Sequence, residues 1–442
     1  MRFDWLWAQS DKIFNLFLWH SYLAIVPVVI GLILAIPVGW GIHHLPSVKS
    51  AIVNLFGLLY TIPSLALFVL LPPLLHTQIL DPINVVVALT IYSFALLVRT
   101  VCDGLDSVSA DTRQSAAALG YKPAQQFFQI DLPLAVPVIG SGLRVAVVSN
   151  VSIVSVAALI GTPQLGSLFT LGLPAAISDS HHRWDRGQHH SGAAAGYAGG
   201  LRHSSTQPLA TSERIIMLTW FMDPIHWFGE GGIFPLLAQH ISYSAVALAI
   251  AFIIAFPVGC YTGHTGKGEG LLIGTTNALR SLPSFGLIIL LVILLSGEFE
   301  SDMAFILPCI LVLVALALPP IALGVHAGIR ALDPYVLDAA RGMGMTRLQI
   351  LLQVELPCAL PLILSGVRSA TLQIISTATI AAYVSLGGFG RLIIDGRAAN
   401  DFSQMIAGAM LVALLALLID CLFSFSQKIV VSPGITRRIK NP

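Results

Sequence analysis

Nine apolar segments, each of roughly 20 residues or more, dominate this 442-residue chain. An α-helix rises about 1.5 Å per residue, so about 20 apolar residues cross the roughly 30 Å hydrocarbon core of a bilayer. Only 10% of the residues are charged, against roughly 25% in soluble domains. We therefore predict an all-α, polytopic membrane protein with spans at 21–40, 51–75, 82–101, 134–160, 241–261, 271–295, 303–325, 360–384 and 405–423.

Four prolines inside these segments limit how the spans can fold. Pro37, Pro63, Pro257 and Pro283 each lack a backbone N–H, so each would kink or break a helix. Membrane proteins tolerate such breaks where neighbouring helices satisfy the freed backbone groups. We therefore expect spans that are not all straight.

Lysines and arginines in the loops set the expected orientation, because cytoplasmic loops carry an excess of them. The loop after the first span of each half carries Lys49 or Lys267, and the long polar loops carry further arginines and lysines. These loops are predicted to be cytoplasmic, and the intervening loops, which lack both residue types, to be outside. Arg391 and Arg397 are exceptions, since they fall on the predicted outer side.

The second half of the chain repeats the first. A-I-P-V-G at 35–39 recurs as A-F-P-V-G at 255–259, and T-I-P-S recurs as S-L-P-S, both with a shift of 220 residues. Further along the shift is 224, which pairs Gly120 with Gly344 and Arg144 with Arg368. Both copies have the same loop charges, so they are parallel repeats of four and five spans, at 1–172 and 217–442. This weakens the alternative of a secondary transporter built on inverted halves.

A polar loop after the third span of each copy carries the most informative pattern. It runs through 114–133 and 338–357, with the same spacing from a glycine to Leu-Pro. The pattern predicts a short helix, a bend at the glycine, a second short amphipathic helix, and a proline that opens the next span. Asp131 and Glu355 would lie at the start of that span, where the helix dipole favours negative charge.

Such a loop is suited to docking against another protein. Phe127, Phe128 and Ile130 in the first copy, and Leu351, Leu352 and Val354 in the second, would offer an apolar knob to a partner's groove. The full set of candidate docking residues is Gln114, Ser115, Ala116, Gly120, Phe127, Phe128, Ile130, Leu132, Pro133, Asp338, Ala339, Ala340, Gly344, Leu351, Leu352, Val354, Leu356 and Pro357.

This spacing resembles the cytoplasmic coupling loop of bacterial ABC-importer permeases, which reads E-A-A, three residues, Gly, nine residues, an aliphatic residue, one residue and Leu-Pro. Asp338 to Ala340 with Gly344 match well, whereas the first copy lacks the acidic residue. The T-I-P-S and S-L-P-S segments, G-M-G-M-T-R at 342–347 and A-T-I-A-A-Y-V-S-L-G-G-F-G at 378–390 are similar to permeases of osmoprotectant importers. The likeness covers about 21–172 and 217 to the C-terminus.

The resemblance implies a permease in a bacterial inner membrane that imports glycine betaine, choline, carnitine or a similar compound. Cytosolic ABC ATPase subunits would dock on the two loops and bind the ATP, and an extracytoplasmic solute-binding protein would deliver the solute. A permease of an amino-acid or methionine-type importer with the same loop, and a non-functional fusion product, remain alternatives.

The absence of other motifs agrees with that picture. No G-x-x-x-x-G-K-[ST] phosphate loop and no H-E-x-x-H motif occurs, so we expect neither an enzyme nor a cofactor held by this chain. The 23 Lys and Arg residues balance 22 Asp and Glu residues, so no nucleic-acid partner is expected. The five cysteines are scattered singly and are interpreted as small core residues.

The segment 173–216 breaks the pattern of the repeat. It is polar, and it replaces the fifth span that the first copy should have. His181, His182, His189 and His190 could ligate zinc or copper, but polar His-rich linkers are commonly just solvated, and we expect no metal site. We hypothesise that an out-of-frame segment joins two permease genes here.

Four residues are candidates for the solute pathway: Arg144, Arg368, Pro63 and Pro283. An arginine inside a membrane helix is a functional hypothesis by default. Near a cytoplasmic helix end, however, its long side chain simply reaches back to the interface. Both interpretations of the arginines stay open at the level of sequence. Aromatic residues such as Tyr60, Tyr92 and Phe285 could face a quaternary ammonium, but in membrane helices such residues usually serve packing.

Overall fold

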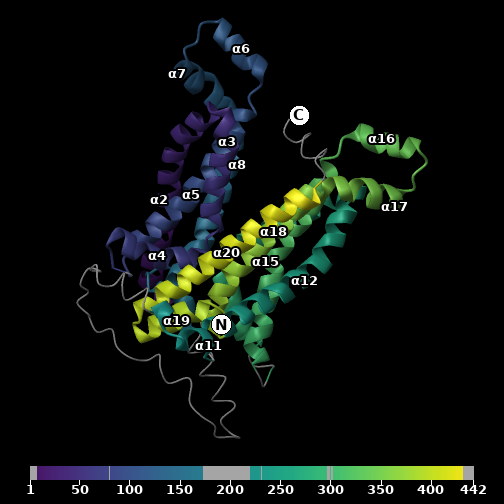
Figure 1. Ribbon diagram of the computed structural model, residues 1–442. Coiled ribbons are helices and arrows are strands. Elements are labelled where there is room, and N and C mark those ends of the chain that lie inside the picture. The colour runs from purple at the N-terminus through teal and green to yellow at the C-terminus, as the bar shows by residue number, and fades with distance from the viewer. Residues whose placement is uncertain are drawn as a thin grey trace. The chain divides into compact units, whose positions relative to one another are not determined.

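The computed structural model describes residues 7–78, 80–172, 220–229, 231–295, 299 and 302–431 (Figure 1). These residues form helices and connecting turns, with no strand among them. They divide into two compact units, the first up to residue 172 and the second from residue 220. The polar segment 173–216, with its four candidate metal-ligating histidines and the predicted junction, lies outside the described residues.

The described part of unit 1 is built from seven α-helices, one π-helix and a final 3-10 helix. Its elements are α2 (Ser10–His43), α3 (Pro46–Thr61), α4 (Ser64–Leu75), α5 (Pro82–Asp106), α6 (Ala110–Ala118), α7 (Pro123–Gln126), the π-helix η1 (Phe127–Asp131), α8 (Leu132–Val154) and the 3-10 helix η2 (Ser155–Ile160). Helices α2, α5 and α8 pack against one another and form the core.

Unit 2 repeats this order of elements and adds two helices at its end. Its elements are α11 (Ile225–Phe228), α12 (Ile233–Thr265), α13 (Glu269–Ser281), α14 (Ser284–Leu295), α15 (Met303–Arg330), α16 (Pro334–Gly342), α17 (Arg347–Ile350), the π-helix η3 (Leu351–Glu355), α18 (Leu356–Ala381), the 3-10 helix η4 (Ala382–Val384), α19 (Gly390–Ala399) and α20 (Phe402–Val430). Helices α12, α15 and α18 form its core, and α20 packs on α18 and α19.

The repeat in sequence therefore corresponds to a repeat in structure. The change of shift from 220 to 224 falls after α4, because the connection before α15 is one residue longer than that before α5 and α15, with 28 residues, is three residues longer than α5, with 25. The recurring A-x-P-V-G segments also have a structural reason. A Cβ on Gly39 would lie 2.6 Å from Val101, and one on Gly259 would lie 2.7 Å from Val325, so only glycine lets the first core helix approach the next.

A buried histidine repeats in the same way. His20 Nε2 lies 3.1 Å from the carbonyl oxygen of Val151, and His240 Nε2 lies 3.2 Å from that of Ile375. Each bond joins the first core helix of a unit to its last core helix. A buried polar side chain needs a hydrogen-bond partner, and here the partner is a backbone carbonyl at the equivalent place in both units.

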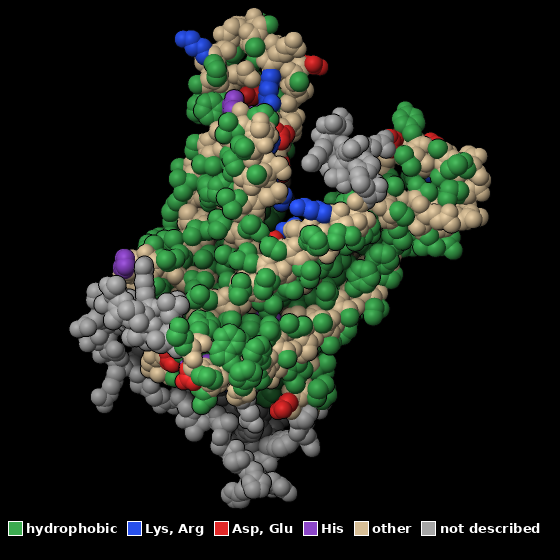
Figure 2. Space-filling model, in the orientation of Figure 1, with side chains coloured by type: hydrophobic (Ala, Val, Ile, Leu, Met, Phe, Trp, Pro, Cys, Tyr) green, Lys and Arg blue, Asp and Glu red, His purple; other side chains and the backbone are tan. Residues whose placement is uncertain are grey.

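Within the described part of the chain, seven helices are long and apolar enough to cross a membrane, and nine spans result if each of two bent helix pairs counts as one. This confirms the all-α membrane class. The segments 51–75 and 271–295 are not straight, however: α3 and α4 meet at 99°, and α13 and α14 at 87°. Figure 2 shows apolar side chains over most of the visible helix surface, with charged ones near the end of unit 1 that carries α6 and α7.

Pro63 and Pro283 stand at the two bends. The residue before a proline is pushed out of the helical region by the proline ring, and Ile62 accordingly adopts φ −67° and ψ 129°. Leu282 does the same, with φ −74° and ψ 128°. Pro37 and Pro257, by contrast, lie inside α2 and α12, which continue past them. Only the two prolines of the P-S pairs break a span.

Candidate functional site

Each unit carries a protruding elbow at one end of its core helices (Figure 1). The first elbow is residues 110–131 and the second is residues 334–355, both named so from here on. Each consists of a short helix, a turn at a glycine, a second short helix of one turn, and a π turn that leads into the last core helix. These are the polar loops that the sequence pattern identified.

The first elbow is shaped by local hydrogen bonds. The backbone N–H of Thr112 donates to Ser109 Oγ at 3.2 Å, which caps α6. Gly120 then has φ +84°, a left-handed conformation that side chains rarely adopt. No atom lies within 4 Å of a Cβ built there. Glycine is therefore required by the backbone conformation and not by lack of space.

The second elbow reaches the same shape with different caps. Asp333 Oδ1 accepts a hydrogen bond of 3.0 Å from the backbone N–H of Tyr335. Gly344 has φ +77°. Thr346 and Gln349 then form a reciprocal capping box, in which the Thr346 N–H donates to Gln349 Oε1 at 2.8 Å. The turn geometry of the two elbows therefore agrees although their sequences differ.

Pro133 and Pro357 lie in the first turn of α8 and α18, as expected, but these helices are not separated from the elbows that precede them. The helical run is continuous from Pro123 to Ile160 in unit 1 and from Arg347 to Val384 in unit 2. Pro133 has no N–H for the carbonyl four residues earlier, and the turn before it widens into the π form. The second half of each elbow and the last core helix of its unit therefore form one continuous helical run.

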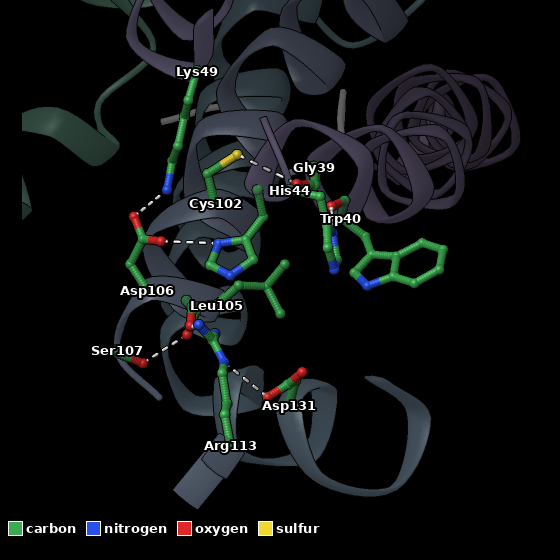
Figure 3. Close-up of polar contacts among 12 residues, drawn as sticks. Gly39, Trp40, His44, Lys49, Cys102, Leu105, Asp106, Ser107, Arg113 and Asp131 are labelled. Atoms are coloured by element: carbon green, nitrogen blue, oxygen red, sulfur yellow. Dashed lines mark hydrogen bonds and ion pairs between the residues drawn. The ribbon is translucent and has the colours of Figure 1, made fainter. Parts of the chain in front are cut away.

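Asp131 is held by side chains rather than by a helix dipole, because it lies inside that continuous run. Arg113 Nε donates to Asp131 Oδ1 at 3.1 Å, and Gln126 Nε2 to Oδ2 at 3.3 Å. Arg113 also donates to the carbonyl oxygen of Leu105 at the end of α5 (Figure 3). One guanidinium thus joins both limbs of the first elbow to the core.

Asp106 anchors the base of the first elbow. It forms an ion pair with Lys49 at the start of α3, and it lies 3.0 Å from His43 Nδ1 at the end of α2 (Figure 3). The Asp106 side chain is about half exposed, so each pair contributes little stability by itself. Together they tie the ends of three helices beside the point where the elbow leaves the core.

Unit 2 holds the equivalent positions with other residues, and Glu355 is held from the core helix α12 and not from within the elbow. His264 Nδ1 lies 2.7 Å from Glu355 Oε2, so Glu355, like Asp131, is held by a side chain. Glu269 lies 4.0 Å from Arg330. With shifts of 220 and 224, Glu269 and Arg330 occupy the places of Lys49 and Asp106. The signs of the two charges are exchanged, and the attraction is kept.

Part of the expected apolar knob is exposed and part is not. Phe128 is 65% exposed and Leu352 is 53% exposed. Phe127, by contrast, is only 3% exposed and packs on Trp40, with ring centroids 4.9 Å apart. Phe127 is therefore a core residue that secures the elbow, and its assignment to the knob is wrong. Sequence reasoning missed five exposed large hydrophobic side chains on the elbows, namely Leu119, Tyr121, Tyr335, Met343 and Leu348.

The other predicted docking residues are divided between surface and interior. Ala116 and Ala340 are buried. The half-buried residues are Ile130, Leu132, Leu351, Val354 and Leu356, and the exposed ones are Gln114, Ser115, Gly120, Pro133, Asp338, Ala339, Gly344 and Pro357. Asp338 pairs with Arg341 at 2.8 Å on the surface of α16.

Arg368 lies well inside its membrane helix, twelve residues past Leu356. At about 1.5 Å per residue this is roughly 18 Å from the start of α18. It does not reach back to the helix end: Nε and Nη2 each donate to a carboxylate oxygen of Asp420 on α20, both at 2.6 Å. Arg144 occupies the equivalent place on α8 and is exposed.

The aromatic side chains of the bent segments contact one another. Tyr60 and Tyr92 form an edge-to-face pair with centroids 5.7 Å apart, and the Tyr92 hydroxyl donates to the carbonyl oxygen of Ile62 at 2.5 Å. Phe285 and Tyr383 form a similar pair at 5.7 Å. These contacts are those of packing residues.

A polar cavity of about 510 Å³ lies at the end of unit 2 away from its elbow. Gln239, Ser385 and the α19 residues Arg391 and Asp395 contribute to its lining. Arg391 Nη2 lies 2.9 Å from Asp395 Oδ1, so the arginine that departs from the charge rule is neutralised by its own neighbour. Among the described residues, no group of three or more His, Cys, Asp or Glu side chains could hold a metal ion.

Asp395 supplies a pH prediction. Partial burial raises the pKa of its carboxyl, although Arg391 acts in the opposite direction. A carboxyl whose pKa is higher in the folded state stabilises the fold at acidic pH, and this contribution is lost as the pH rises through the raised pKa. As the pH is raised from acidic to neutral, the melting temperature of Asp395→Asn should therefore fall less, or rise more, than that of the parent. Parallel melting curves of the two proteins would contradict this.

The chain matches a family model described as binding-protein-dependent transport system inner membrane component, over residues 28–179 and 247–433. The two matched segments agree with the predicted tandem of two copies. The bent pairs, the elbows and the last core helices of both units lie within them.

Curated relatives match about half of the chain each. The osmoprotectant import permease protein of Salmonella typhimurium is 33% identical over 219 residues, 48% of this chain and 100% of its own length. A choline transport system permease protein of Bacillus subtilis is 30% identical, over 45% of this chain and 88% of its own. A solved inward-facing structure of the MetNI methionine ABC transporter shares 21% identity, with a TM-score of 0.40, over 45% of this chain and 96% of its own.

Proposed function

The chain belongs to the family of binding-protein-dependent transport system inner membrane components, and from this premise we propose that it is the permease of an ABC importer for osmoprotectants. Glycine betaine, choline and carnitine are the expected solutes, because the curated relatives are named as permeases for these compounds or for osmoprotectants. The protein is then a multi-pass component of a bacterial inner membrane and not an enzyme itself.

The observation that carries the coupling mechanism is the continuous helical run from each elbow into a core helix. A separate cytosolic ATPase binds and hydrolyses ATP, because this sequence has no phosphate loop of its own. The exposed Phe128 and Leu352 side chains insert into grooves of that ATPase. Movement of the ATPase subunits then turns α8 and α18, since no flexible joint separates these helices from the elbows.

The base of the first elbow is tied to several core elements. Arg113 joins the elbow to α5 as well as to Asp131, and Asp106 holds the ends of α2 and α3 nearby. The force is therefore shared among all three helices of the core. An extracytoplasmic solute-binding protein delivers the solute at the opposite end of the helices.

A glycine pair on the second elbow gives a sharp test of coupling. Gly344→Ala forces a side chain into a left-handed conformation, which costs about 1–2 kcal/mol, and so distorts the elbow without filling any space. Gly342→Ala is the matched control, because this glycine ends α16 and also has nothing within 4 Å of a built Cβ. We expect Gly344→Ala to reduce ATP-dependent glycine betaine uptake about tenfold, and Gly342→Ala to leave it unchanged.

The measurement uses proteoliposomes that contain the full chain, the ATPase subunit of the same importer and its solute-binding protein. Co-purification of the ATPase is recorded in parallel and should fall with the uptake. Equal uptake and equal co-purification for both variants would refute the docking role of the second elbow. Uptake that proceeds without ATP would refute the ABC assignment. Uptake of methionine but not of glycine betaine would show that the solute is an amino acid and not an osmoprotectant.

A further inference from the structure

In unit 2 a buried ion pair joins Arg368 of α18 to Asp420 of α20. Asp420 is only 1% exposed, and both of its oxygens accept hydrogen bonds from Arg368. Arg368 lies twelve residues from the start of α18, and Asp420 lies ten residues from the end of the antiparallel α20. These separations correspond to roughly 18 and 15 Å along the two helices. The two charges therefore meet at one depth and neutralise each other.

Unit 1 contains the arginine but not the acid. Arg144 is also twelve residues from the start of its helix, and the structure gives it no ion pair or hydrogen bond among the residues it describes. The residues from 173 to 219 contain no apolar run long enough for a span, so the sequence of the first copy provides no counterpart of α20. An unpaired guanidinium at this depth is costly in a bilayer, where charged side chains pair or face water.

In unit 2, α20 packs against α18 and places Asp420 on Arg368, the equivalent of Arg144. Along α8, the exposed residues Pro137, Gly140, Arg144, Val148 and Val151 follow one another at helical spacing. Their equivalents in unit 2 are all half-buried or buried, namely Pro361, Leu364, Arg368, Leu372 and Ile375. The difference forms one stripe, with the arginine at its centre.

We propose that this stripe of α8 binds a membrane helix from a separate polypeptide. The partner helix is apolar, like α20, and carries a single Asp or Glu about ten residues from the end that lies beside the first elbow. Its carboxylate accepts two hydrogen bonds from Arg144, as the carboxylate of Asp420 does from Arg368. The proposal concerns the assembly of unit 1 and does not depend on the transported solute or on ATP.

The helix α20 itself provides the probe. A dye-labelled peptide of residues 400–431 is added to the full chain in phosphatidylcholine vesicles, and binding is measured by energy transfer to an acceptor on the N-terminus of the chain. We expect saturable binding that weakens at least about tenfold when the chain carries Arg144→Leu. The same loss is expected when the peptide carries Asp420→Asn, a comparison that leaves the chain unaltered. Combining Arg144→Asp in the chain with Asp420→Arg in the peptide should restore binding.

Three outcomes would overturn the proposal. The first is that the parent peptide fails to bind, and the second is that binding is equal for the parent and Asp420→Asn peptides. The third is binding that is lost in an Arg368→Leu chain and kept in an Arg144→Leu chain, because the peptide would then be exchanging with α20 of unit 2. Since neither ATPase nor solute is present, these results leave the transport proposal untouched.

Discussion

Arg368→Leu is expected to lower the free energy of unfolding by about 3–5 kcal/mol, because it leaves the buried carboxylate of Asp420 without its cation. Breaking one side of a buried pair is far more damaging than replacing both, since the remaining charge stays out of water. The double variant Arg368→Leu with Asp420→Leu should therefore recover most of the loss. Thermal unfolding of the purified chain in detergent measures all three proteins.

Arg144→Leu is the matched control within the same chain. Arg144 has the same place on α8 but is exposed, so its replacement breaks no ion pair of the isolated chain and should leave the stability equal or raise it, because an unpaired charge is removed from an apolar helix. Equal losses for Arg144→Leu and Arg368→Leu would show that both arginines are held in the same way. It would then be wrong that the face of α18 with Arg368 is covered by α20 while the face of α8 with Arg144 is exposed.

Gly366→Leu is expected to be the second most damaging change, at about 3 kcal/mol. A Cβ at Gly366 would lie 2.5 Å from the carbonyl oxygen of Pro320 and 3.2 Å from the Cα of Gly324. The obstacles are backbone atoms of α15, which cannot rotate away as a side chain can, so α18 and α15 would have to separate. Thermal unfolding should show the loss, and transport should decrease with it.

Gly140→Leu on α8 separates this effect from a general intolerance of bulky residues. No atom lies within 4 Å of a Cβ built on Gly140, and unit 2 carries Leu364 at the equivalent place. Its stability should change by about 0.5 kcal/mol or less. A large loss for Gly140→Leu, or none for Gly366→Leu, would contradict the helix contacts described above.

The elbows show how far the sequence pattern reaches. The glycine, the Leu-Pro pair and the spacing between them predicted the position, order and bend of each elbow, because a left-handed turn and a helix start are local events. The pattern did not predict that Phe127 would turn inward onto Trp40 while Phe128 stays exposed. That choice depends on a helix more than 80 residues earlier in the chain, and neighbouring phenylalanines have the same local preferences.

For the charged residues, the sequence revealed where the charges lie but not which charges pair. The loop arginines and lysines predicted an orientation, and the single intramembrane arginines were visible as unusual residues. Their partners were not, because Arg113 with Asp131 and Arg368 with Asp420 are separated by 18 and 52 residues. Nothing in the local sequence distinguishes Arg368, which is paired, from Arg144, which is exposed.

The sequence by itself determined the membrane class, the tandem repeat and the two elbows of this protein. Transfer of an apolar segment into lipid and the conformational range of glycine and proline are properties of short stretches of chain. Only the tertiary structure decided that the spans break at Pro63 and Pro283 while α2 and α12 continue past Pro37 and Pro257, which phenylalanine is buried, and which arginine meets an acid. These outcomes depend on which surfaces of distant helices come into contact, since a buried charge or ring is stabilised only by the neighbours that the fold places beside it.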